Sequence, residues 1–214
     1  AGVAGGPHED KAAVAPAADD WQMYVPFEEA SGNRDNWVSD NVLEPQRAVA
    51  QAAGKIGYGV SGGDIGDGYF QLNPVIGVWA KKRTILAWLN AGAGSGDCTI
   101  VYRDSGWDFF QIYDRPSDPK LRFIIGGVGS GYLSGIPLGE WVLAVGRYQA
   151  PGVVNTYADA QSICYKADGT KLTGPVEEAW RDHGFRGIHR AMVNLDGSGD
   201  ELRVVDRWLS DDWI

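Results

Sequence analysis

From residue 21 onward the sequence is a succession of short apolar-rich runs, each bounded by clusters of Gly, Asp, Asn, Pro or Ser. Such runs are the length of β-strands, and the clusters are typical of points where a backbone reverses. The pattern predicts strands at residues 22–27, 58–60, 68–72, 84–90, 99–103, 108–113, 120–125, 141–149, 161–166, 189–195 and 201–208. Residues 21–214 are therefore predicted to form one all-β sandwich around a single core.

Two features refine this prediction. The segment 176–183 places Glu177 and Glu178 ahead of Arg181, a charge order that favours a short surface helix. Trp88 and Trp141 lie within predicted strands, and we expect both side chains to be buried in the core.

Residues 1–20 differ from the rest, because Ala, Gly and Pro dominate and no aromatic residue or hydrophobic period occurs. This composition predicts an extended N-terminal arm that cannot form a core of its own. Such an arm becomes ordered by docking on a neighbouring subunit or by folding back over its own domain. The residues expected to make its contacts are Val3, Pro7, Val14 and Pro16.

The formal net charge of −9 argues against a nucleic-acid partner or an anionic membrane surface. The basic run Lys81 to Arg83 precedes a strand and is expected to form a solvated strand edge. The sequence contains no run of about 18 apolar residues, so it predicts no membrane-spanning helix. Cys98 and Cys164 allow one disulfide at most, and two free buried thiols are favoured. The first residue is Ala, as expected after removal of either an initiator Met or a signal peptide.

Ten segments, in order, resemble the concanavalin A-like lectin/glucanase superfamily, and within it the laminin G-like domain. They include an aromatic strand with an acidic Ser-Gly turn at 23–32, a Trp-bearing strand at 84–89, a second at 139–145, an Asp-Gly turn at 168–169 and a Leu-Ser-Asp-Asp tail at 209–212. The resemblance implies a jelly-roll sandwich. Residues 150–161 depart from it, as a Pro-Gly-containing insertion that could help in docking.

The superfamily includes sugar binders, calcium-dependent adhesive modules, glycan-cleaving enzymes and structural subunits, so the residues must discriminate among them. Retaining glycosidases on this fold carry paired carboxylates spaced Glu-x-Asp-x-x-Glu along one strand, and that spacing is absent. Gln111 and Tyr113 could share a strand face, but no Arg or His motif accompanies them as in polysaccharide-cleaving relatives. We therefore expect no enzymatic activity.

Three acidic or hydroxyl residues, Asp196, Ser198 and Asp200, alternate through a glycine loop and form the one candidate calcium site. The loop lacks the bidentate Glu of a strong calcium motif, so ordinary turn chemistry is the alternative and no cofactor is required. Sugar rings stack on exposed aromatic side chains, and Trp107 and Tyr132 are the residues expected to bind glycan if any do.

Two functional hypotheses result. The first is a structural subunit that decorates a large protein assembly, such as a phage capsid or tail, and docks through residues 1–20. The second is a lectin-like adhesion domain that binds surface glycans, with or without calcium; a glycan-cleaving enzyme is third. Either of the first two would act on a virion surface or outside a cell.

Overall fold

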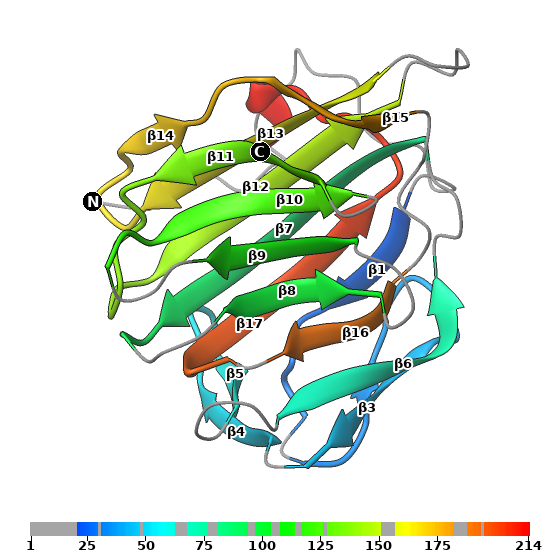
Figure 1. Cartoon of the computed structure of the whole chain (residues 1–214). Coiled ribbons are helices and arrows are strands. Elements are labelled where there is room, and N and C mark those ends of the chain that lie inside the picture. The colour runs from blue at the N-terminus through cyan, green and yellow to red at the C-terminus, as the bar shows by residue number, and fades with distance from the viewer. Residues whose placement is uncertain are drawn as a thin grey trace.

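In the computed structural model the chain forms two antiparallel sheets packed face to face (Figure 1). The structure describes residues 21–214 except 30, 48, 63–67, 77–80, 94–96, 104–107, 114–116, 126–127, 151–156, 182–187 and 194. Residues 1–20, predicted as the arm, lie outside the described residues.

The strands are β1 (Trp21–Val25), β2 (Arg34–Asp35), β3 (Val42–Gln46), β4 (Val49–Ala53), β5 (Tyr58–Gly62), β6 (Tyr69–Ile76), β7 (Lys82–Ala91), β8 (Cys98–Tyr102), β9 (Phe109–Tyr113), β10 (Lys120–Ile125), β11 (Val128–Ser134), β12 (Val142–Gln149), β13 (Tyr157–Lys166), β14 (Lys171–Thr173), β15 (Glu177–Arg181), β16 (Ile188–Val193) and β17 (Gly197–Val205). A short 3-10 helix, Asp211–Trp213, follows them. No helix in this described part of the chain is long and apolar enough to cross a membrane.

One sheet has the order β14-β13-β12-β7-β17-β5-β4, with β1 also bonded to β17 and β15 to β13. We call it sheet A. The other, sheet B, has the order β11-β10-β9-β8-β16-β6-β3-β2 and lies in front in Figure 1. Strands of sheet A and strands of sheet B are interleaved along the sequence, so neither sheet forms from one continuous segment.

The core lies between the sheets and is filled by side chains from alternate positions of each strand. In β7, for example, Ile85, Ala87 and Leu89 are fully buried members of the core. Phe110 and Phe123 stack on one another from sheet B, with ring centres 4.8 Å apart. The all-β sandwich predicted from the sequence is confirmed, and every predicted strand overlaps an observed one.

The predicted helix at 176–183 is wrong, because residues 177–181 form strand β15. β15 pairs with β13, with Glu178 opposite Asp159 and Glu177 opposite Ala160. The charge order that favoured a helix gives only a few tenths of a kcal/mol, less than the backbone hydrogen bonds at the edge of a sheet provide.

The prediction that Trp88 and Trp141 are buried in the core is also wrong, since both are only partly buried. Trp88 alternates with Ala87 and Leu89, so it points to the outer face of sheet A. There Lys55 Nζ lies 5.0 Å from the centre of its ring. Trp141 lies just before β12, whose Val142 points into the core.

The basic run is not a strand edge, although Lys81 and Lys82 are exposed to solvent. β7 lies between β12 and β17 in the middle of sheet A. Arg83 is completely buried, and its Nε donates to Asp206 Oδ1 over 2.6 Å. A buried guanidinium needs such a partner, and Asp206, the residue that follows β17, provides it.

The predicted insertion at 150–161 is shorter than expected. β13 begins at Tyr157, and its Asp159 pairs with Gln149 of β12. The second half of the predicted insertion therefore belongs to sheet A. Residues 151–156 lie outside the described residues.

The segment that follows β17 packs against the outer face of sheet A. A second apolar cluster, Leu86, Val145, Ile163, Val205 and Leu209, lies there. Arg147 is 7 % exposed; it donates to Leu209 O over 2.6 Å and to Gln161 Oε1 over 2.6 Å. Its Nη2 also lies 2.9 Å from Asp211 Oδ1. Arg147 thus fastens residues 209–211 to the sheet.

We expect Arg147→Ala to lower the free energy of unfolding by about 3 kcal/mol, because it leaves the Leu209 carbonyl and the Gln161 amide oxygen buried without a donor. Chemical denaturation measures this loss. Lys82→Ala, which removes an exposed cation at the start of β7, is the matched control and should change stability by less than about 0.5 kcal/mol. Equal stability of the two variants would contradict this role of Arg147.

Candidate functional site

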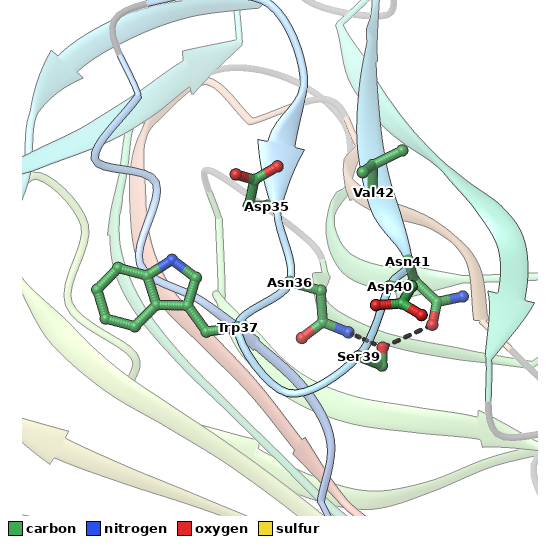
Figure 2. Close-up of a pocket in the computed structure, with 7 residues that line it drawn as sticks. All are labelled: Asp35, Asn36, Trp37, Ser39, Asp40, Asn41 and Val42. Atoms are coloured by element: carbon green, nitrogen blue, oxygen red, sulfur yellow. Dashed lines mark hydrogen bonds between the residues drawn. The ribbon is translucent and has the colours of Figure 1, made fainter.

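A shallow pocket of about 390 Å³ lies where the chain turns from β2 into β3 (Figure 2). Its lining is formed by Asp35, Asn36, Trp37, Ser39, Asp40, Asn41 and Val42. The volume falls within the range of small-molecule sites, although this pocket is open to solvent. Figure 2 shows the indole of Trp37 on one side of the loop and the Asn36, Ser39 and Asn41 side chains on the other.

Asn36 organises the loop that forms the pocket. Its side chain is 6 % exposed, and its Oδ1 accepts from the Tyr24 N–H over 2.9 Å. Its Nδ2 donates to Gln22 O over 3.1 Å and to Ser39 Oγ over 2.7 Å. Ser39 Oγ in turn donates to Asn41 Oδ1 over 2.6 Å, and these last two bonds are drawn in Figure 2. The loop is thereby fixed before any ligand arrives, which lowers the entropic cost of binding.

Trp37 is the most exposed large apolar side chain of the described residues, at 62 %. The Trp37 backbone N–H donates to Tyr24 O over 2.9 Å, and the indole ring meets the Tyr24 ring edge to face at 5.4 Å. Exposure of a large indole costs hydrophobic free energy. A fixed, exposed indole offers a flat apolar face on which a ligand can pack.

Tyr24 is itself held in place from β17. The Arg203 guanidinium lies 4.8 Å from the Tyr24 ring centre, and the Tyr24 hydroxyl donates to Glu201 Oε1 over 3.1 Å. Burial raises the pKa of Tyr24, and the Glu201 carboxylate raises this pKa further, so the hydroxyl stays protonated and keeps donating. Trp37 therefore rests on a rigid support.

The pocket is acidic. Of the residues that line it, Asp35 and Asp40 are exposed carboxylates and none is basic. The nearest arginine in sequence, Arg34, is 2 % exposed, and its Nη1 donates to Gly32 O over 2.6 Å. Its positive charge is therefore held below the surface, and the pocket presents carboxylates and amides to a ligand.

Of the three predicted calcium residues, Asp200 is engaged by backbone groups of the domain. Asp200 is fully buried, and its Oδ2 accepts from the Ile56 N–H over 2.9 Å while its Oδ1 accepts from the Glu201 N–H over 2.8 Å. No group of three or more His, Cys, Asp or Glu side chains in the described ranges is placed to hold a metal ion. Calcium at Asp196, Ser198 and Asp200 stays a prediction, and Asp200 instead ties the turn between β4 and β5 to β17.

None of the other predicted site residues that the structure describes lines the pocket. Trp107 and the arm residues Val3, Pro7, Val14 and Pro16 lie outside the described residues. Tyr132 is partly buried in β11, where its N–H donates to Glu177 Oε2 over 3.1 Å. Cys98 and Cys164 are free and buried. Burial raises the pKa of the Cys164 thiol to about 11, so this thiol is unreactive at neutral pH.

Gln111 and Tyr113 share the outer face of β9, because Phe110 and Ile112 point into the core. An arginine of the neighbouring strand β10 accompanies them. Arg122 of β10 lies directly opposite Gln111. Its guanidinium carbon lies 3.6 Å from the centre of the Tyr113 ring. An arginine supplied by the neighbouring strand is not visible as a motif within one strand.

The sequence contains a signal for the pocket as well. Residues 33–41 read Asn-Arg-Asp-Asn-Trp-Val-Ser-Asp-Asn, a turn-rich string interrupted by one tryptophan. Turn residues favour exposure, so a tryptophan among them is a candidate for an exposed ring.

No family model and no curated protein matches this chain. Among solved structures, the chain is similar to domain 4 of AbnA, an extracellular GH43 arabinanase from Geobacillus stearothermophilus, solved with arabinotriose. That domain is 16 % identical, and the match covers 89 % of this chain and 94 % of that one with a TM-score of 0.54.

The chain is also similar to the receptor-binding domain of a botulinum neurotoxin C/D mosaic serotype, at 10 % identity and a TM-score of 0.56, covering 91 % of this chain and 49 % of that one. The binding domain of botulinum neurotoxin DC in complex with SialylT has a TM-score of 0.59 at 8 % identity, covering 92 % and 50 %. This chain spans about half the length of the neurotoxin domains. These likenesses show a common β-sandwich fold.

The buried Asp200 makes a testable contribution to stability. Burial is the main cause that raises its pKa from 3.8 to about 6, and the neighbouring Glu201 carboxylate adds to the rise. Between these two pH values the folded state binds more protons at Asp200 than the unfolded state does. The stabilising contribution of Asp200 is therefore full below about pH 4 and is lost as the pH rises through about 6.

We expect Asp200→Asn to be less stable than the unsubstituted protein throughout, because Asn offers one acceptor oxygen where two backbone N–H groups need one each. The stability difference between the two proteins should shrink as the pH rises from about 4 to about 7. Denaturant unfolding across this range measures it. A difference that is constant or grows with pH would show that the folded-state pKa is not raised.

Proposed function

We propose that this domain is a non-catalytic carbohydrate-binding module whose ligand stacks on Trp37. The exposed, rigidly supported indole, on a loop that also carries carboxylate and amide groups, is the observation that carries the proposal. Sugar rings present an apolar C–H face and a rim of hydroxyl groups, so they match an aromatic surface flanked by hydrogen-bonding side chains.

The similar solved structures add support. One is described in complex with arabinotriose, one in complex with SialylT, and one as a neurotoxin whose cell entry depends on two ganglioside molecules. We extend glycan binding to this chain because the fold is shared and because Trp37 and its polar neighbours offer the appropriate chemistry.

We further propose that the chain is a laminin G-like member of the concanavalin A-like superfamily, located outside a cell or on a virion surface. This rests on the strand order and motifs of the sequence together with the sandwich fold. Docking of the domain into a larger assembly through residues 1–20 stays a prediction from composition alone.

The absence of catalysis is part of this proposal. The buried carboxylate Asp200 is engaged by backbone N–H groups, and Glu201 accepts from Tyr24 and Arg203. Each of these carboxylates is occupied by hydrogen bonds within the domain, an arrangement suited to structure rather than to proton transfer.

Trp37→Ala should weaken binding of neutral oligosaccharides by about tenfold or more, because it removes the stacking surface. Calorimetric titration with arabinotriose and with other neutral trisaccharides measures the loss. Tyr58→Ala is the matched control, since Tyr58 is also exposed, at 54 %, but lies on β5 outside the pocket. Equal affinity of Trp37→Ala and the unsubstituted protein, or equal loss in both variants, would refute the role of Trp37.

A further inference from the structure

The outer face of sheet B presents a second surface of different chemistry. Core residues alternate with outward ones in these strands: Leu121 and Phe123 point inward in β10, and Phe110 and Ile112 do so in β9. Arg122 and Gln111 therefore point outward. By the same alternation Arg190 points outward from β16, because its neighbour Ala191 belongs to the core.

Arg122 is held flat and close to the surface. Its guanidinium carbon lies 3.6 Å from the centre of the Tyr113 ring, and the side chain is 14 % exposed. The acidic group that the structure places nearest to it, Asp97 Oδ2, is 3.9 Å from Nη2, and Asp97 also accepts from Gln111 Nε2 over 3.1 Å. The Arg122 Nε is buried and has no hydrogen-bond partner among the described residues, so only the terminal nitrogens of the guanidinium can face a ligand. The two terminal nitrogens of a planar guanidinium are suited to a bidentate contact with an oxyanion.

Arg190 stands in a similar aromatic setting. Its guanidinium carbon lies 4.3 Å from the Tyr69 ring centre and 5.6 Å from that of Tyr102. Tyr102 in turn stacks on Phe109 at 4.8 Å. Two arginines and several partly exposed rings thus share one sheet face.

The two arginines are well separated. β10 and β16 are three strand spacings apart in sheet B, which corresponds to about 14 Å across the sheet. A single small anion cannot contact both. An extended ligand with a repeated negative charge can, and the rings between them offer flat apolar surface to its sugar units.

From this geometry we propose that the outer face of sheet B, centred on Arg122 and Arg190, binds acidic polysaccharide. The shared chemistry is an oxyanion on a sugar, either a uronate carboxylate or a sulfate. The site is distinct from the acidic Trp37 pocket, which lies beside β2 and β3 and repels such ligands. Because the chain carries a net charge of −9, attraction is local to this face.

The test is affinity electrophoresis and calorimetry with polygalacturonate, dextran sulfate and uncharged dextran, at about 50 mM and about 300 mM salt. At least one of the acidic polymers binds, more tightly at low salt, whereas dextran shows no such dependence on salt. Binding of polygalacturonate indicates a carboxylate site, and binding of dextran sulfate alone indicates a sulfate site. Failure of both acidic polymers to bind overturns the proposal.

Variants locate the binding. Arg122→Gln lowers the affinity for the acidic polymer by about tenfold or more. Arg122→Lys keeps the charge but loses the planar guanidinium, so it lowers this affinity less. Arg190→Gln gives a second, independent loss three strands away. Circular dichroism confirms that each variant is folded.

Lys82→Gln is the matched control, because it removes one exposed positive charge from sheet A. It leaves binding unchanged, and so does Trp37→Ala, whose effect is confined to neutral sugars. Equal loss in Lys82→Gln and Arg122→Gln, or no loss in both arginine variants, overturns the proposal. The titration of Trp37→Ala with neutral sugars tests the proposed function separately, because its result does not depend on whether acidic polymers bind.

Discussion

Strand β17 is the element on which the rest of the structure depends. Along one edge it pairs with β7, and along the other it pairs first with β5 and then with β1. Between the residues that pair with β5 and those that pair with β1, β17 carries one extra residue relative to β7. Glu201 lies at this point and adopts a positive φ of 53°. Such a bulge redirects side chains locally. At this point Asp200 turns to the β4–β5 hairpin, while Glu201 turns to Tyr24 and so supports Trp37.

The middle of both sheets was predictable from the sequence, because central strands are buried and read as apolar runs. The strands that sequence reasoning missed, β2, β3, β4, β11, β14 and β15, lie at or next to the ends of the sheets. Such strands need little apolar content and tolerate residues such as Pro45, so their composition resembles that of loops. β15 was even read as a helix, since its local charges carry no information about pairing with β13.

The candidate surfaces were less predictable, and the reason is geometric. Trp37 matters because Tyr24, Arg203 and Glu201 support it, and the Tyr24 and Glu201 side chains that meet are 177 residues apart. Arg122 matters because it lies across the sheet from Gln111. The prediction that Trp88 and Trp141 are buried in the core was wrong for a related reason. Both faces of sheet A carry apolar residues, and alternation alone does not say which face meets the core.

The position of β17 also has a consequence for how the molecule is made. All of its partners precede it along the chain, so during synthesis β1, β5 and β7 leave the ribosome with an unsatisfied edge and must wait for it. Pairings of such long range are slow to form and leave strand edges open in the meantime. Sheet A therefore closes only after residue 205 has emerged, and the contacts of Glu201 and Arg203 with Tyr24 beneath Trp37 form no earlier than that strand.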